Sequence, residues 1–145
     1  MIWQGLGYYS RANRIHQASK ILIDLIGVNR DDDPYCWPNG IDQWMSLPGI
    51  GRSTAGSIVS SAFDLPAPIL DGNVKRIFSR LFAVKKSSIN DEKKLWRYSN
   101  CLISNPSPRD FNQALMDLGT IIHTAKKNKL FFIHYKIIVL HIRST

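Results

Sequence analysis

The stretch LPGIGRSTA, Leu47 to Ala55, places two glycines two residues apart behind a proline and then opens into a helical pattern. Glycine adopts positive φ angles readily and leaves no Cβ in the way of a close approach to the backbone. The N–H groups at the start of the following helix point outward, and the helix dipole favours an anion there. The stretch therefore predicts two helices joined by a tight turn that is suited to a phosphate group.

A second interpretation of the turn stays open from the spacing alone, namely a plain helix–helix connection with glycine caps. Two features favour the phosphate. Arg52 directly follows the turn, and 19 Lys and Arg against 11 Asp and Glu give a net charge of +8 and a pI near 9.7. Such a charge favours polyanionic partners, nucleic acid first and a membrane surface second. Ile50, between the glycines, is expected to pack into the helix pair and hold the hairpin together.

The rest of the chain predicts an all-α fold, because apolar residues recur at the i, i+3, i+4 and i+7 spacing of helices. The first four expected helices cover residues 15–26, ended by Gly27, and then 41–46, about 52–63 and 74–82. A fifth helix is entered near Asn90 or Asp91 and contains Leu95 to Ile103. A sixth begins at Pro108 with Ser107 as its N-cap, and its inward-facing residues are expected to be Phe111, Ala114, Leu115 and Leu118. The segment 29–40 is expected to be a loop. The apolar end of the chain from residue 129 has no clean period, so a strand, a buried helix and disorder all stay open there.

The bulk composition limits the protein class. A chain of 145 residues with 44% hydrophobic and 10% aromatic residues is enough for one domain with a core. The two cysteines, Cys36 and Cys101, are too few for a disulfide framework, so a reducing compartment is the default. No secretory signal opens the chain, and no apolar run reaches the ~20 residues needed to span a bilayer. We therefore expect a soluble, intracellular protein.

Four blocks of the sequence resemble known DNA repair enzymes. The first block, LPGIGRSTA, looks like the hairpin of the helix-hairpin-helix base-excision DNA glycosylases. The other three resemble one branch of that family, the adenine DNA glycosylases, and lie in the family's order and spacing. They are WQGLGYYSRANRIHQA (Trp3 to Ala18), ILDGNVKRIFSRLFAV (Ile69 to Val84) and RDFNQALMDLGT (Arg109 to Thr120). Together the blocks cover most of residues 3–122.

The resemblance implies a domain organisation. Residues 1–104 would form most of the six-helix barrel domain of these glycosylases, with the hairpin at 47–55. Residues 105–145 would correspond to the start of the iron–sulfur cluster domain, with a divergent tail from about residue 123. The implied reaction is the hydrolytic removal of adenine mispaired with 8-oxoguanine or guanine in double-stranded DNA, by a monomer that does not act on membranes. The location would be the bacterial cytoplasm and its nucleoid, or else a nucleus or organelle.

Asp71 is the candidate catalytic carboxylate. Cleavage of a glycosidic bond passes through an oxocarbenium-like sugar, which a nearby carboxylate stabilises. From the local sequence alone an N-cap role is favoured, because an Asp ahead of Gly-Asn-Val starts many helices. The resemblance reverses this preference, since Asp71 falls on the family's catalytic aspartate, and both roles can coexist. Asn73 matches a family asparagine that helps to position the reacting centre; alone it is a polar residue early in a helix.

Ser53 predicts which kind of glycosylase this is. The related bifunctional glycosylase-lyases carry a lysine at this point of the hairpin, and its amine forms a Schiff base with the sugar. A serine hydroxyl cannot form an imine, so the resemblance favours a monofunctional glycosylase. The alternative is that Ser53 simply occupies the first turn of a helix, where serine is common.

The resemblance also assigns the DNA-binding residues. Extrusion of a base leaves a gap in the stack that an aromatic ring can fill. This role falls to Tyr8, whereas Tyr9 is expected to pack locally. The hairpin residues expected to meet the DNA backbone are Pro48, Gly49, Ile50, Gly51, Arg52 and Ser53. For Lys75, Arg76 and Arg80, phosphate contact and plain solvation stay open.

Two family features have no counterpart in the sequence. The family's general acid is a glutamate upstream of the Trp3 block, and this chain begins at Met1. General acid catalysis contributes about 10²- to 10⁴-fold, so we expect weak DNA binding and little or no activity. The four cluster-ligand positions of the family fall on His123, Leu130, Ile133 and Val139. Clusters are held by thiolates, so no cofactor and no metal are expected in this chain.

Two rival functions stay open beside the glycosylase. The chain would be a non-catalytic helix-hairpin-helix DNA-binding module if Asp71 served only as a cap. It would be a non-functional gene remnant if the product did not fold.

Overall fold

The computed structural model describes residues 7–26, 37–82, 84, 89–103 and 106–124, and every regular element within them is a helix. The helices are α1 (Tyr9–Ile26), α2 (Ile41–Met45), α3 (Arg52–Phe63), α4 (Gly72–Leu81), α5 (Ile89–Leu102) and α6 (Pro108–Thr124). The all-α prediction is confirmed. The tail from residue 125 and most of the expected loop 29–40 lie outside the described residues.

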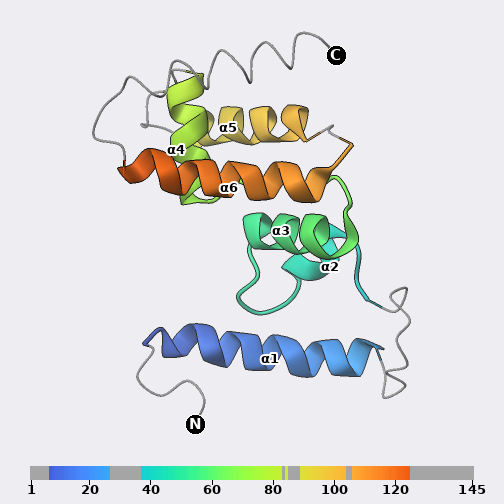
Figure 1. The fold of residues 1–145 in the computed structure, drawn as a ribbon. Coiled ribbons are helices and arrows are strands. Elements are labelled where there is room, and N and C mark those ends of the chain that lie inside the picture. The colour runs from blue at the N-terminus through green and yellow to red at the C-terminus, as the bar shows by residue number, and fades with distance from the viewer. Residues whose placement is uncertain (1–6, 27–36, 83, 85–88, 104–105, 125–145) are drawn as a thin grey trace.

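The helices are arranged as one stack (Figure 1). Helices α4, α5 and α6 form one end, α3 lies beside α6 with α2 packed on α3, and α1 lies at the opposite end. The first core cluster joins α1, α2 and α3, and the second joins α4 and α5, with α6 packed against it. The extended segment between α3 and α4 belongs to both, because Ala67 lies in the first cluster while Ile69 and Leu70 lie in the second. This buried segment therefore ties the two halves of the stack together.

Helix α6 differs from its predicted packing at one face. It begins at Pro108, as predicted, and the N–H of Phe111 donates to the carbonyl of Ser107. Leu115 is half-buried as expected, but Ala114 is exposed, so that prediction is wrong. The deepest side chain of the helix is Asn112, which is only 1% exposed. Asn112 replaces Ala114 in the interior because its amide satisfies two polar groups there, as described below.

Helix α1 buries less of its apolar stripe than the periodicity suggests. Ala18 is buried and Leu22 is half-buried, and both join the first core cluster. Leu25 remains 66% exposed. The expected packing of Tyr9 is wrong, since its side chain is 59% exposed at the start of the helix.

None of the helices within the described residues combines the length and the apolar character required to cross a membrane.

Candidate nucleic-acid interface

The turn after α2 has the tight geometry that its glycines predict. Gly49 has φ +81°, and a Cβ on it would lie 2.8 Å from the Cβ of Arg14 on α1. Both the left-handed backbone and the close approach therefore require glycine. The N–H of Ile50 donates to the carbonyl of Leu47 at 3.2 Å, and the Ile50 side chain packs against the first core cluster, as predicted. The Ile50 side chain therefore anchors the hairpin to the first core cluster.

Gly51 leaves the start of α3 open. It is the N-cap of the helix, with φ −87° and ψ 169°, and no side chain caps the first turn. Gly51 is exposed, and a Cβ on it would meet no atom within 4 Å. The first N–H groups of α3 have no intrahelical acceptor. A phosphate can approach these groups without meeting a side chain at the cap.

Ser53 links the hairpin to the candidate carboxylate. Its hydroxyl oxygen accepts a hydrogen bond from the N–H of Leu70 at 3.0 Å. Leu70 directly precedes Asp71, so the first turn of α3 holds the backbone one residue ahead of that carboxylate. The alternative interpretation of Ser53, as a residue merely suited to a first turn, therefore misses a tertiary contact.

Asp71 is the N-cap of α4, as the local sequence predicts. Its Oδ1 accepts a hydrogen bond from the N–H of Val74 at 2.8 Å, and the residue is half-buried. Within the described residues, the cap occupies only this one carboxylate oxygen. The hydrogen bond restrains the Asp71 side chain through Oδ1. The structural role and a catalytic role are therefore compatible.

The segment that carries Asp71 is held by polar side chains that sequence reasoning missed. The Ser99 hydroxyl on α5 donates to the carbonyl of Ile69 at 2.7 Å. The amide of Asn112 donates to the carbonyl of Ala67 and to the hydroxyl of Ser60, both at 2.9 Å. All three polar side chains are buried. The signal that could have found them is a lone Ser or Asn in an apolar helical stripe, since a buried polar group needs a partner.

A glycine completes this support. Gly56 on α3 is buried, and a Cβ there would lie 2.3 Å from the carbonyl oxygen of Pro68. Helix α3 therefore packs directly on the backbone of the segment 67–70. This close approach explains why the hairpin and Asp71 keep a defined relative position.

Asn73 lies on the first turn of α4, under the end of α6. A Cβ on Gly119 would lie 2.5 Å from the Cβ of Asn73, so α6 presses on this turn. The side-chain oxygen of Asn73 accepts from Nη2 of Arg76 at 2.9 Å, and Nε of Arg76 donates to the carbonyl of Gly72 at 3.1 Å. Asn73 and Arg76 thus brace the start of the helix that Asp71 caps.

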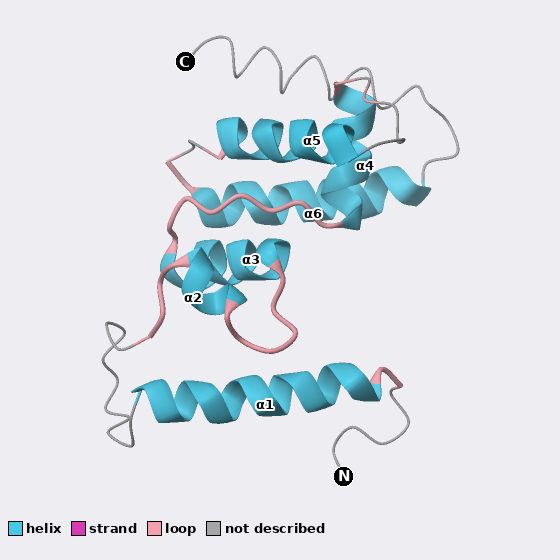
Figure 2. Cartoon of the chain, turned by 180° about the vertical axis from the view of Figure 1, so that it is seen from behind, coloured by secondary structure: helices cyan, strands magenta, loops and turns pink. Residues whose placement is uncertain are grey.

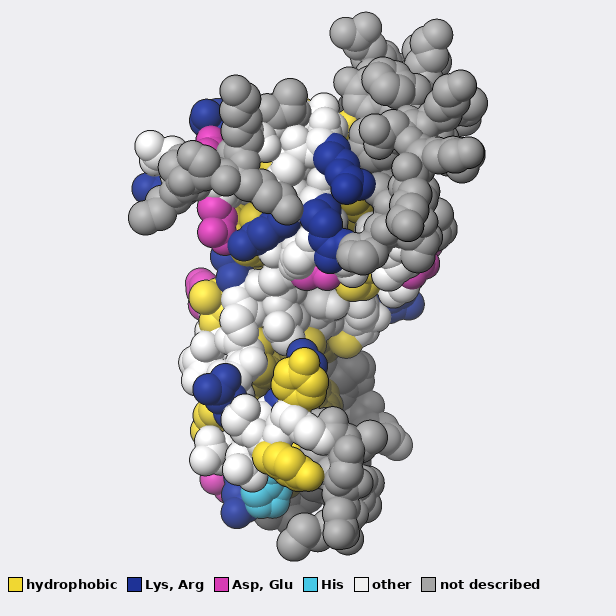
Figure 3. Space-filling model, turned by 90° about the vertical axis from the view of Figure 1, so that its left-hand side faces the viewer, with side chains coloured by type: hydrophobic (Ala, Val, Ile, Leu, Met, Phe, Trp, Pro, Cys, Tyr) yellow, Lys and Arg dark blue, Asp and Glu magenta, His cyan; other side chains and the backbone are white. Residues whose placement is uncertain are grey.

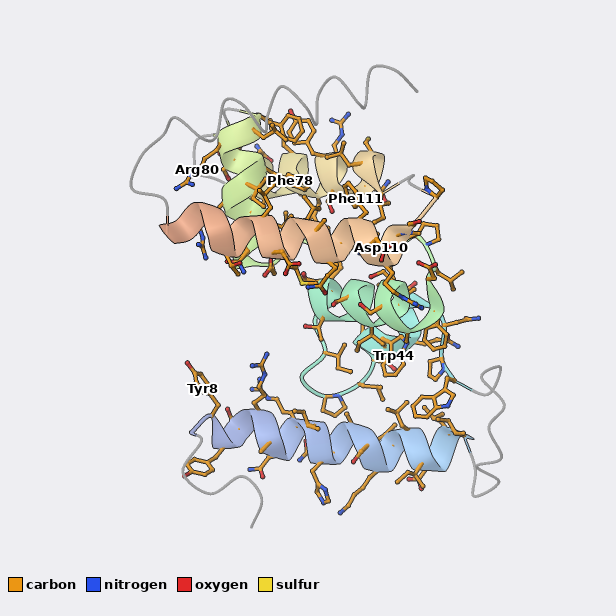
Figure 4. All side chains as sticks on the ribbon, viewed as in Figure 1. Tyr8, Trp44, Phe78, Arg80, Asp110 and Phe111 are labelled. Carbon is orange, nitrogen blue, oxygen red and sulfur yellow. The ribbon has the colours of Figure 1, made fainter. Side chains whose placement is uncertain are left out.

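The three cations of α4 have different environments. Lys75 pairs with Glu92 on α5 at 2.6 Å. Nη1 of Arg76 is buried and has no partner in the described part of the chain. Arg80 is exposed (Figure 4). The plain solvated alternative therefore fits Arg80 but not the other two.

Tyr8 is held out into solvent at the entry to α1. Its side chain is 81% exposed, and its φ is +50°, which a bulky residue rarely adopts. The preceding Gly7 also has positive φ, and the Tyr8 carbonyl accepts from the N–H of Arg11. Figure 4 shows Tyr8 projecting from α1 toward the side on which the other helices lie.

The candidate residues gather on one side of the stack. The N-terminal ends of α1, α3 and α4 all lie on the same side of the stack in Figure 1 and in the reverse view of Figure 2. These ends carry Tyr8, the glycine turn and Asp71 respectively. Figure 3, which looks onto this side, shows Lys and Arg side chains over the α4–α6 end and apolar side chains over α1. A basic face with an exposed aromatic ring is typical of nucleic-acid binding.

The predicted cluster positions lie mostly outside the described residues. Leu130, Ile133 and Val139 fall in the tail, and His123 is placed only as part of α6. One imidazole and three aliphatic side chains do not match the thiolate donors of an iron–sulfur cluster. Within the described residues no group of His, Cys, Asp and Glu is arranged to hold a metal.

Comparison with known proteins gives a consistent result. Residues 1–101 match the model of the HhH-GPD superfamily base excision DNA repair proteins. The chain is 39% identical over 122 residues to an adenine DNA glycosylase of Buchnera aphidicola (strain Bp), covering 83% of this chain and 32% of that protein. It is 38% identical over 126 residues to that of Schizosaccharomyces pombe (85% and 26%) and 35% identical over 129 residues to that of Homo sapiens (87% and 22%). The chain therefore spans about a third or less of the length of these curated relatives.

Proposed function

The chain belongs to the HhH-GPD superfamily of base excision DNA repair proteins, and we propose that it hydrolyses the N-glycosidic bond of adenine mispaired with 8-oxoguanine or guanine in duplex DNA. The observation that carries the proposal is the hydrogen bond from the Leu70 N–H to Ser53. This bond couples the phosphate-binding turn to the carboxylate in the next residue. A DNA backbone held at the turn would bring a sugar of the same strand near Asp71.

In this mechanism each candidate residue has one task. A phosphate lies against the N–H groups at the start of α3, where Gly51 leaves the approach open. The adenine leaves the stack, and Tyr8 fills the gap. As the bond between C1′ and adenine breaks, Asp71 stabilises the oxocarbenium-like sugar, and Asn73 keeps the first turn of α4 in place. A water molecule then adds its hydroxyl group to C1′, and the remaining proton of that water is taken up by the leaving adenine.

The family assignment supports a location where DNA is found, namely the cytoplasm of a bacterium or a nucleus or organelle. Among partners, DNA follows from the family, and the double-stranded form, the specific mispairs and a monomeric state are part of the proposal. The name of these relatives, adenine DNA glycosylase, supports adenine as the base removed.

The proposal is tested by base release from short duplexes that carry adenine opposite 8-oxoguanine, guanine or thymine. We expect slow release from the first two, in line with the low activity expected from the sequence, and none from the adenine·thymine pair. Strand cleavage should require added alkali, and borohydride should trap no covalent protein–DNA adduct, because Ser53 offers no amine. Equal release from all duplexes, or a trapped adduct, would contradict the proposal.

Replacement of Gly51 by alanine is expected to weaken duplex binding about tenfold. The added Cβ meets no protein atom and is compatible with φ −87°, so the fold is retained. It stands, however, where a phosphate would approach the N–H groups, and the loss of a hydrogen bond of about 1.4 kcal/mol corresponds to tenfold in affinity. Fluorescence anisotropy with a labelled duplex measures the change.

Gly40→Ala is the matched control. Gly40 is also a glycine N-cap, at the start of α2, and a Cβ there meets only the flexible Gln43 side chain. Both variants should lose a similar ~0.5 kcal/mol of stability, but only Gly51→Ala should bind DNA less tightly. Equal affinity of the two variants would show that the turn is a plain connection.

A further inference from the structure

A basic pocket lies beside the hairpin, and of its lining residues only Arg52 is also a hairpin residue expected to meet DNA. It has a volume of about 310 Å³ and is lined by Arg52, Lys93, Trp96, Arg97 and Asn100. Arg52 comes from the first turn of α3. The other four follow the i, i+3, i+4 and i+7 pattern, so they share one face of α5.

Among the described residues, the pocket is lined by three cations and by no acidic side chain. Within the described residues, the ion pairs of neighbouring lysines lie elsewhere: Lys75 with Glu92 and Lys94 with Asp91. Three cations around one pocket repel one another, and an anion in the pocket would relieve this repulsion.

Arg52 is oriented by an aromatic ring. Its guanidinium carbon lies 4.1 Å from the centroid of the Trp96 ring. A cation stacked on tryptophan is stabilised by the ring quadrupole, and its planar N–H donors stay available at the edge. Arg52 is exposed, so those donors can meet a ligand. The contact turns Arg52 toward α5.

We propose that this pocket binds a second phosphate of the DNA backbone, next to the phosphate held at the turn. Arg52 follows Gly51 directly, and successive phosphates of one strand advance by about 3.4 Å along the duplex axis. A backbone that enters at the turn therefore passes within reach of Arg52, Lys93 and Arg97. Helix α5 would then extend the interface beyond the hairpin. The inference rests on the proposed function for duplex DNA as the ligand.

The test is a salt titration of duplex binding with the double variant Lys93→Gln, Arg97→Gln. The slope of log K against log[salt] becomes shallower by about 0.9 for each lost phosphate contact, so loss of the one phosphate in the pocket should make the slope shallower by about 1. The control is Lys20→Gln, Lys94→Gln, which removes the same charge from exposed side chains of α1 and α5 outside the pocket. The control slope should match that of the unmodified chain. Equal slopes for the two double variants would overturn the proposal.

The result separates the pocket from the proposed function. If the turn variant Gly51→Ala weakens binding while the pocket variant does not, the pocket proposal fails and the glycosylase proposal stands. If the pocket variant makes the slope shallower but adenine is never released from a mispair, the pocket stands and the glycosylase proposal fails. Absence of any duplex binding by the unmodified chain would overturn both.

Discussion

Asp71→Asn is expected to slow adenine excision by about 10²- to 10³-fold while leaving the fold and DNA affinity unchanged. The loss corresponds to about 3–4 kcal/mol of transition-state stabilisation, the usual effect of removing one electrostatic partner. The fold is retained because asparagine is as good an N-cap as aspartate. Its side-chain oxygen can still accept from the N–H of Val74, where Oδ1 accepts at 2.8 Å. The variant therefore removes the charge alone.

Single-turnover assays with protein in excess over the mispaired duplex measure the rate. A second readout applies if the native rate is very low: binding to a duplex with a cationic azasugar in place of the reacting nucleotide. Such a cation mimics the oxocarbenium transition state and should bind more tightly than a neutral abasic analogue. Asp71→Asn should lose this preference.

Two controls separate the catalytic from the structural role of Asp71. Asp71→Ala removes the cap as well and should cost about 1 kcal/mol of stability. Asp110→Asn neutralises an exposed acid in the first turn of α6 and should leave excision unchanged. If Asp71→Asn excises adenine at the native rate and keeps the azasugar preference, Asp71 is a cap only and the non-catalytic module is the better description.

Gly56→Ala is expected to lower the free energy of unfolding by about 2–3 kcal/mol. The new Cβ would lie 2.3 Å from the carbonyl oxygen and 3.2 Å from the carbonyl carbon of Pro68. Because both atoms belong to the backbone, either α3 or the segment 67–70 must move, and overpacking of this kind usually costs 1–3 kcal/mol. A chain of this size should then melt roughly 10 °C lower. Thermal unfolding followed by circular dichroism measures the shift.

The matched control is Gly72→Ala, at the first residue of α4. A Cβ there approaches only Nη2 of Arg76, at 4.0 Å, and alanine is the better helix former. This variant should melt at or slightly above the native temperature. Equal melting of the two variants would show that α3 does not rest on the segment that leads to Asp71.

The helices and the hairpin could be predicted from local patterns, because periodicity, glycine, proline and cap residues act over a few neighbours. The start of α6 at Pro108, the short α2 and the packing of Ile50 all agree with the structure. The errors at Ala114 and Tyr9 have a common cause. Periodicity shows which residues share a face, but not how much of that face another helix covers.

By itself the sequence determined the all-α class, the tight turn, the cap at Asp71 and the membership of a DNA repair family, since each depends on short-range chemistry or on matching blocks. Only the tertiary structure decided how the turn and the carboxylate are joined. They are joined by the hydrogen bond between Ser53 and Leu70 and by the contact of α3 with Pro68. Hydrogen bonds from Ser99 and Asn112 to the carbonyls of Ile69 and Ala67 hold the same segment. These contacts link residues 12 to 45 positions apart. A buried polar group signals that it needs a partner, but the packing of the helices selects which one it meets.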